Sequence, residues 1–205
     1  MSERIIAQPV TANLNSIIMS APASGSPILH TPRLVLRPVQ EGDVEDIYAI
    51  YSDETALEHF AREPLEDLAD AQKMLDDNLA FDEDKAAKFW AICLAESDRM
   101  IGTFTLFHIS ESNRRGEVGY ILNREFWGNG YASEALKCMI DYCFDTLEFG
   151  RLEADVDPAN TGSLRLLERN GFEREGYFRK RWYVRDTWFD SVMFGLINPG
   201  IEEKD

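Results

Sequence analysis

The sequence contains no long hydrophobic run: none of its apolar stretches reaches the roughly 18 residues that a membrane-spanning helix needs. Its first residues, MSERIIAQPV, lack the basic and then apolar pattern of a secretory signal. Cysteine is scarce, with only Cys93, Cys138 and Cys143, and no two of them form a C-x-x-C pair. We therefore expect no membrane contact, no disulfide framework, no metal site and a cytoplasmic location.

Basic residues are also few. The chain has 21 lysines and arginines against 37 aspartates and glutamates, which gives a formal net charge of −16. Between Glu41 and Asp98 there are 18 acidic and only 4 basic side chains. Because phosphate contacts need clustered lysine and arginine, this balance argues against a nucleic-acid partner. Two explanations of the acidic segment stay open: it attracts a cationic substrate, or it keeps the chain soluble.

Length and composition are those of one globular domain. With 205 residues, 44% of them hydrophobic and 11% aromatic, the chain can bury a sizeable core. Residues 1–27 include the segment APASGSP and show little periodicity, so we predict a flexible N-terminal extension there. The folded domain is expected to span residues 28–198, followed by a C-terminal tail of residues 199–205.

Hydrophobic periodicity predicts an α+β fold. Consecutive strands without helices between them imply an antiparallel sheet, whereas one strand–helix–strand unit, residues 116–157, implies one parallel pair with a right-handed crossover. The expected strands are residues 33–39, 88–95, 99–109, 115–122 and 151–157, and two more that are joined near residues 184–186. The expected helices lie within residues 41–53, 66–81, 131–147 and 158–171.

A glycine-rich turn precedes the longest predicted helix, in the stretch EFWGNGYASEALKCMIDYC. Glycine costs about 0.5–1 kcal/mol in regular structure, so Gly128 and Gly130 indicate positive φ or the close approach of another group. The first amide groups of a helix have no partner inside it, and the helix dipole adds partial positive charge there. The turn therefore predicts an anion cradle suited to a pyrophosphate, although a tight turn alone would also explain both glycines.

Other phosphate-binding motifs do not fit this turn. The pattern G-x-x-x-x-G-K-[ST] is absent from the sequence. A dinucleotide fingerprint counted from Gly128 places Ser133 where the last glycine or alanine belongs, and it needs repeated strand–helix–strand units, of which only one is predicted. The sequence also offers no Ser–His–Asp constellation and no metal-ligand spacing.

The stretch EVGYILNREFWGNGYASEAL resembles the acetyl-CoA-binding core of the GNAT (Gcn5-related) N-acetyltransferases. In their signature, Gln/Arg-x-x-Gly-x-Gly/Ala, Trp127 takes the first position, Gly130 the fourth and Ala132 the sixth. The form WGNGYA, together with NTGSLRLLERNGF and both ends of the domain, is similar to the RimJ/RimL-like branch, which acetylates ribosomal-protein N-termini. The resemblance covers roughly residues 30–197. It implies the GNAT acyl-CoA N-acyltransferase fold, three-layered, with a mostly antiparallel sheet whose one parallel pair is splayed around the cofactor.

The resemblance also implies how acetyl-CoA is held. The pyrophosphate would lie against the glycine-rich turn, and the pantetheine arm would pair with the preceding strand as an added strand. Gly119, inside that strand, is expected at a bulge or a close approach, and a bulge would open the gap for the thioester. The implied cofactor-binding residues are Tyr120, Ile121, Leu122, Trp127, Gly128, Asn129, Gly130, Tyr131, Ala132, Ser133, Asn160 and Ser163.

The implied chemistry is direct attack of a primary amine on the acetyl carbonyl in a ternary complex. The amine must be neutral to attack, and Glu117, two residues before Gly119, is expected to remove its proton. Amides of the bulged strand would stabilise the oxyanion. Many family members protonate the leaving thiolate with a tyrosine, but Leu167 stands in that place here. Ser163 is the remaining candidate, as an acid or as a hydrogen-bond donor to the sulfur.

The acceptor is less well defined. The RimJ/RimL-like resemblance favours a protein N-terminal α-amine. A small cationic amine, either a polyamine or an aminoglycoside, and a non-catalytic acyl-CoA-binding module stay as alternatives. In the family the acceptor pocket lies between the first two helices and the last hairpin, which weakly indicates Glu58, His59, Phe60, Tyr183 and Trp188. Aromatic residues on the predicted hairpin are compatible with either a monomer or a homodimer.

Overall fold

The computed structural model describes residues 26–60, 62–83, 87–184 and 186–201. The predicted N-terminal extension, residues 1–27, therefore lies almost wholly outside the described residues, as does part of the predicted tail. Two residues of the predicted extension are packed: Ser26 is fully buried, and the Pro27 carbonyl accepts a 2.8 Å hydrogen bond from the Trp90 indole. Ser26 and Pro27 therefore pack against the folded body, while the domain boundary near residue 27 stays a prediction.

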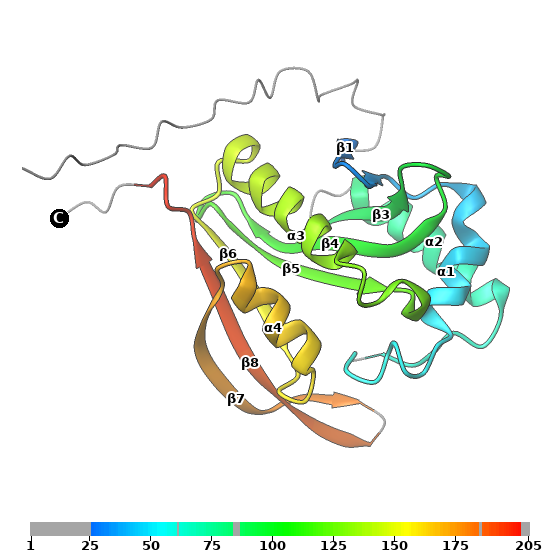
Figure 1. Cartoon of the computed structure of the whole chain (residues 1–205). Helices are drawn as coiled ribbons and strands as arrows, with labels where there is room; N and C mark the ends of the chain where they lie inside the picture. Colours follow the sequence, from blue (N-terminus) through cyan, green and yellow to red (C-terminus); the bar gives the residue numbers. More distant parts are fainter. Residues whose placement is uncertain (1–25, 61, 84–86, 185, 202–205) are drawn as a thin grey trace, which may run out of the picture.

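Within the described residues, eight strands form one sheet in the order β1-β2-β3-β4-β5-β6-β8-β7, and helices cover both of its faces (Figure 1). The strands are β1 (Leu29–His30), β2 (Leu34–Arg37), β3 (Lys88–Leu94), β4 (Met100–Ser110), β5 (Arg115–Leu122), β6 (Arg151–Val156), β7 (Glu173–Val184) and β8 (Thr187–Ile197). The helices are α1 (Val44–Tyr51), α2 (Leu68–Glu83), α3 (Tyr131–Asp141) and α4 (Thr161–Arg169). The predicted α+β fold and its order of elements are confirmed, with the short β1 added. No helix in the described part of the chain is both long and apolar enough to cross a membrane.

Strands β5 and β6 run parallel and separate soon after they meet. Residues 115–117 pair with residues 151–153, and the recorded pairing stops there. Beyond that point β5 stays paired with β4 as far as Leu122, and β6 stays paired with β8 as far as Val156. The two strands are thus held by different neighbours on either side of a gap. This confirms the predicted splayed parallel pair.

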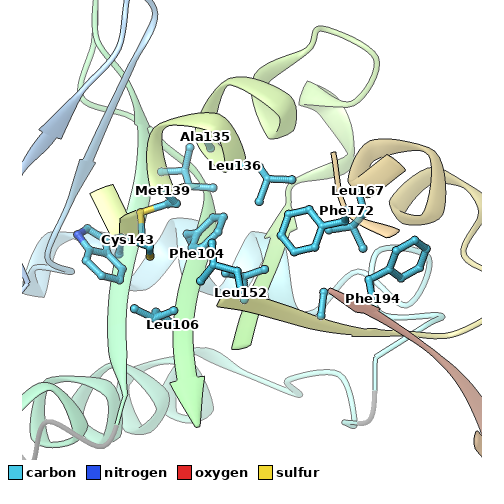
Figure 2. Close-up of a cluster of buried hydrophobic side chains, with 14 of the residues drawn as sticks. Phe104, Leu106, Ala135, Leu136, Met139, Cys143, Leu152, Leu167, Phe172 and Phe194 are labelled. Carbon is cyan, nitrogen blue, oxygen red and sulfur yellow. The ribbon is translucent and has the colours of Figure 1, made fainter. Parts of the chain in front are cut away.

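Each face of the sheet carries its own hydrophobic cluster. Helices α1 and α2 pack over one face, and α3 and α4 pack over the other (Figure 1). Figure 2 shows part of the second cluster, where Leu136 and Met139 of α3 lie on the same side as Phe104 of β4 and Leu152 of β6. Full burial of such a side chain contributes roughly 1.5–3 kcal/mol. This packing fixes α3, and with it the turn at its N-terminal end, against the centre of the sheet.

Side chains along β5 alternate between the two clusters. Val118 and Leu122 belong to the cluster under α3 and α4, whereas Ile121 belongs to the cluster under α1 and α2. The strand period of two therefore places Glu117 and Gly119 on the α1–α2 side together with Ile121, as predicted from the sequence.

The predicted bulge at Gly119 is wrong. The register of β4 and β5 runs unbroken from Glu117 to Leu122, and its irregularity lies between Phe107 and Ser110 of β4, where His108 has a φ of 50°. A bulge in the neighbouring strand leaves no local pattern in the sequence of β5. The alternative prediction, that another group approaches Gly119 closely, is confirmed, because a Cβ atom built there would lie 3.1 Å from the Phe107 ring.

The turn before α3 explains its glycines. Gly128 and Gly130 have φ values of 76° and 80°, in the left-handed region that glycine enters without steric cost, and Gly130 caps the helix. The α-helix ends at Asp141 and continues as a π-turn over Tyr142–Thr146. The predicted helix over residues 131–147 is therefore present, with a change of hydrogen-bond pattern in its last turn.

Candidate active site

Two cavities border the gap between β5 and β6. The first, of about 330 Å³, is lined by Glu117, Asp155, Asp157 and Asp190, and we call it the acidic cavity. The second, of about 620 Å³, is lined by Trp127, Gly128 and residues 130–133, and we call it the glycine-turn cavity. Both volumes lie in the range of small-molecule sites. The cavities adjoin, because they share the lining residues His59, Phe60, Tyr120, Ile121, Asn160 and Ser163.

The glycine-turn cavity collects nearly all of the residues predicted to bind a cofactor. It is lined by Tyr120, Ile121, Leu122, Trp127, Gly128, Gly130, Tyr131, Ala132, Ser133, Asn160 and Ser163. Asn129 is the exception: its side-chain amide donates to the carbonyls of Phe126 and Trp127, and its own carbonyl accepts from Arg33. The amides at the start of α3 have no acceptor within the helix. They therefore give this cavity a set of N–H donors and the positive end of a helix dipole.

Arg33, which the sequence did not single out, holds the turn in place. Its guanidinium group donates to the Asn129 carbonyl at 2.9 Å and to the Glu134 carboxylate at 2.6 Å. It also lies 4.6 Å from the centre of the Tyr131 ring. These contacts tie the segment before β2 to both the turn and the first turn of α3. Because Arg33 is about half exposed, its ion pair adds orientation more than stability.

Two cations line the glycine-turn cavity. Arg165 and Arg169 lie on α4 one helical turn apart, and both line the cavity, together with one carboxylate, that of Glu58. Guanidinium groups bind phosphates with directed hydrogen bonds. A cavity that offers helix-start amides, two arginines and glycines in the left-handed region suits the diphosphate and phosphate groups of coenzyme A.

The acidic cavity has the opposite charge. Of its lining residues, four are carboxylates, and in the described chain no lysine or arginine lines it. Asp157 pairs with His59 at 2.9 Å, and Asp155 accepts from Arg181 and Trp182 at 3.3 Å. Asp190 accepts from the Tyr177 hydroxyl group at 2.6 Å, and this bond in particular holds its pKa below the usual value. Arg181 bonds Asp155, and Arg179 and Lys180 lie near Asp190, but none of the three lines the cavity. The lining itself therefore carries four carboxylates and suits a cationic ligand.

Glu117 is a buried residue of the acidic cavity, at 8% exposed. Burial raises its pKa above the ordinary glutamate value, while a hydrogen bond between its Oε2 and His108 Nδ1, 3.0 Å long, opposes that rise. The neighbouring Glu153 is paired with Arg115 and Arg151. A buried carboxylate with a raised pKa, facing a cavity, has the properties of a general base.

The residues that line both cavities include two that carry hydroxyl groups, Tyr120 and Ser163. Burial raises the pKa of Tyr120 to about 12, and the nearby Ser163 hydroxyl group opposes part of that rise. The Tyr120 oxygen is buried, and it forms no well-aligned hydrogen bond with any described residue. Asn160 caps α4 by accepting a 3.0 Å hydrogen bond from the Ser163 amide, so its side chain has the structural role that cap residues usually have.

The five residues weakly predicted for the acceptor pocket separate into three groups. His59 and Phe60 line both cavities, and Glu58 lines only the glycine-turn cavity. Tyr183 and Trp188 line neither, so the prediction is not supported at these two positions. They form a cross-strand pair with ring centres 4.8 Å apart and remain more than half exposed. Their neighbours Trp182 and Phe189 form the next pair of the hairpin and do line the acidic cavity.

Several site residues carried no usable signal in the sequence. His108 reaches Glu117 only because of the irregularity in β4. Asp155 and Asp157 come from the end of β6, and Asp190 comes from β8, so their proximity depends on long-range pairing. Arg165 and Arg169 were the most accessible to sequence reasoning, since residues four apart share one face of a helix.

Comparison with known proteins agrees with this geometry. The family model described as an acetyltransferase (GNAT) domain matches residues 33–173. The uncharacterized N-acetyltransferase YoaA of Bacillus subtilis (strain 168) is 32% identical over 173 residues, 84% of this chain and 98% of YoaA. The putative ribosomal N-acetyltransferase YdaF of the same organism is 33% identical over 98 residues, 48% of this chain and 54% of YdaF.

A solved structure shares the fold. It is that of spermidine N-acetyltransferase from Vibrio cholerae in complex with CoA and spermine, which has a TM-score of 0.72 and 21% identity, and the match covers 82% of this chain and 97% of that one. GNAT acetyltransferases use acetyl-CoA as acetyl donor, and the glycine-turn cavity has the donors that its phosphates require. The chain belongs to the GNAT family, and it is an acetyl-CoA-dependent N-acetyltransferase.

Proposed function

We propose that the protein transfers the acetyl group of acetyl-CoA to a primary alkyl amine that carries additional positive charge. One observation carries the proposal: a cavity lined by four carboxylates adjoins the glycine-turn cavity across a shared wall. The anionic cofactor would occupy the cavity that has amides and arginines, and the cationic acceptor would occupy the acidic one. The reacting groups would meet at the shared wall, between the separated ends of β5 and β6.

In this proposal the diphosphate lies at the start of α3, against the amides of residues 128–133. The pantetheine arm runs along the free edge of β5, next to Tyr120, Ile121 and Leu122, where β6 no longer pairs. Asn160 and Ser163 border the arm from α4. This route brings the thioester to the wall that both cavities share, within reach of an amine in the acidic cavity.

Glu117 acts as the base. The amine nitrogen forms a bond to the acetyl carbon, Glu117 takes the proton released by the nitrogen, and the C–S bond breaks to release the thiolate. The free β6-facing edge of β5 offers backbone amides for the developing oxyanion. His108, 63% exposed by its side chain, connects Glu117 to solvent, to which the proton can pass.

The charge of the acidic cavity favours an alkyl amine over an α-amine. An alkyl amine has a pKa near 10.4 and enters as a cation, whereas an α-amino group, with a pKa of about 7.7–8.0, is largely neutral at slightly alkaline pH. Carboxylates that attract a cation, and a buried base that deprotonates it, therefore contribute more for an alkyl amine. A polyamine or an aminoglycoside offers several such charges, and we place polyamines first because the cavity volume is only about 330 Å³.

A protein N-terminus is the second candidate acceptor. It is supported by the RimJ/RimL-like form of the turn, WGNGYA, and by the partial similarity to YdaF. A peptide would place its α-amine at Glu117 and its following residues along the exposed aromatic hairpin of β7 and β8. The two candidates share the same cofactor site and the same base, and they differ only in the amine that is acetylated.

The test is a measurement of thiol release from acetyl-CoA with three acceptor sets: polyamines, aminoglycosides and peptides that carry free N-termini. We expect polyamines to give the highest kcat/KM. Peptides that exceed polyamines by tenfold or more would overturn the first candidate in favour of the second. Tight acetyl-CoA binding with no acceptor turned over in any set would instead indicate a non-catalytic acyl-CoA-binding module.

A further inference from the structure

We propose that Tyr120 is a further catalytic residue, whose hydroxyl group donates a hydrogen bond to the sulfur of coenzyme A as the C–S bond breaks. The inference rests on the proposed position of the thioester at the shared wall of the two cavities. It assigns a task to a side chain that the sequence indicated only as part of the strand beside pantetheine.

The position of Tyr120 is the first argument. The acetyl group must pass from the occupant of one cavity to the occupant of the other, so the thioester must lie where the cavities adjoin. Tyr120 lines both cavities from β5, and Ser163 lines both from α4. These two residues therefore border the proposed position of the sulfur from the two sides of the gap.

The second argument is the state of the hydroxyl group. Its oxygen is buried and forms no well-aligned hydrogen bond within the described residues. The centre of its ring lies 6.0 Å from the centre of the Phe104 ring. Buried polar groups in proteins are almost always paired, so an oxygen without a well-aligned partner, on a residue that borders both cavities, points to a ligand atom as its partner. A rigidly held donor of this kind costs no reorganisation when charge develops on the leaving group.

The third argument is the residue at position 167. Leu167 is fully buried and lines the acidic cavity, so α4 brings a hydrocarbon side chain to the position at which the resemblance to the family implies a tyrosine. Tyr120 brings a phenol to the same wall from the opposite strand. Ser163 is smaller and lies beside it, which suits a supporting contact with either the sulfur or the phenol.

The pKa values decide how Tyr120 acts. Burial raises its pKa to about 12, whereas a free alkyl thiol has a pKa of about 8.5. The phenol therefore keeps its proton and stabilises the thiolate as a hydrogen-bond donor. The electron pair of the broken C–S bond stays on sulfur, Glu117 holds the proton from the amine, and the thiolate takes a proton from solvent when CoA leaves.

The test is a binding cycle with two ligands and two proteins. Wild type and Tyr120→Phe are each titrated at pH 9 with CoA and with the analogue in which hydrogen replaces the thiol. At this pH much of the thiol is ionised, so we expect wild type to bind CoA about 3- to 10-fold more tightly than the analogue. In Tyr120→Phe this preference should disappear while the affinity for the analogue stays unchanged. Tyr48→Phe, which removes an exposed phenol that bonds to the Glu66 carbonyl, is the matched control.

Turnover supplies the second measurement. We expect Tyr120→Phe to lower kcat about 10- to 100-fold with an unchanged KM for the amine, because the contact forms mainly in the transition state. If Tyr120→Phe still bound CoA more tightly than the analogue, Tyr120 would have no such role. The same conclusion would follow if Ser163→Ala lost that preference and Tyr120→Phe kept it. Failure of wild type to bind either ligand would instead refute the proposed cofactor site, so the two failures are distinguishable.

Discussion

The two cavities adjoin along one wall and yet have opposite charge, and they are built in different ways. The glycine-turn cavity takes its positive character from one short segment, residues 127–133, and from two arginines of α4. The acidic cavity takes its carboxylates from β5, the end of β6 and β8, which meet only in the folded sheet. The glycine-turn cavity thus depends on local backbone geometry, whereas the acidic cavity depends on side chains that the tertiary structure brings together.

This difference predicts separate responses to mutation. Changes in the acidic cavity should alter kcat and the KM for the amine while acetyl-CoA affinity is unchanged. Changes at the turn should alter acetyl-CoA affinity with little effect on the KM for the amine. A variant that disturbs both equally would show that the cavities form one coupled site.

The largest effect is expected for Glu117→Gln. Loss of the general base should lower kcat by about 10²- to 10⁴-fold, while the Kd of acetyl-CoA, measured by calorimetry, stays within about twofold. Glu148→Gln is the control, since this carboxylate is 78% exposed and paired with Arg114 on the surface. Wild-type kcat in Glu117→Gln would remove Glu117 from the mechanism.

The next largest effect is expected at Gly130. Substitution by Asp adds a charge and substitution by Asn does not, so comparing the two variants separates the effect of charge from that of backbone strain. Both residues tolerate the left-handed region better than other L residues, and a Cβ there would meet only Arg33, at 3.5 Å. Gly130→Asp places a carboxylate at the helix start and should weaken acetyl-CoA binding about 100-fold. The loss of acetyl-CoA affinity in Gly130→Asn should be at least tenfold smaller than the loss in Gly130→Asp. Equal Kd values for the two variants would argue against a phosphate at this position.

The same contrast explains what the sequence could predict. The turn is encoded locally: positive φ at Gly128 and Gly130 requires glycine, and the adjoining apolar stripe specifies α3. The residues predicted to bind the cofactor therefore lie together in one cavity, except Asn129, whose side chain turns back onto the loop.

The residues of the acidic cavity could not be predicted from local sequence in the same way. In the last hairpin, Trp182 and Phe189 face the cavity while the adjacent pair, Tyr183 and Trp188, does not. Adjacent residues of a strand point to opposite faces, so the choice between the pairs depends on a register that composition does not specify. His108 is a similar case, because the irregularity of β4 that directs it to Glu117 leaves no periodic signal.

A smaller effect is expected for Asp190→Asn, which removes one negative charge from the acidic cavity and keeps its shape. The hydrogen bond from Tyr177 keeps Asp190 ionised at assay pH, so the neutral variant should raise the KM for a polyamine about 3- to 10-fold. Added salt should narrow the difference between variant and wild type. Arg165→Gln is the counterpart at the other cavity, expected to raise the Kd of acetyl-CoA with the amine KM unchanged.

The smallest effect is a shift in pH dependence at His108. Glu117 must be ionised to act, and burial raises its pKa, so kcat/KM should fall as the pH drops through that raised value. The hydrogen bond from His108 opposes the rise, while the charges of Asp155 and Glu153 add to it. His108→Gly accepts the φ of 50° but removes the donor, so its acidic limb should move to higher pH by about 0.5–1 unit. His108→Asn accepts the same φ and keeps an N–H donor, so its limb should stay closer to that of wild type. A limb that moves equally in both variants, or in neither, would show that the His108 contact does not set the ionisation of the base.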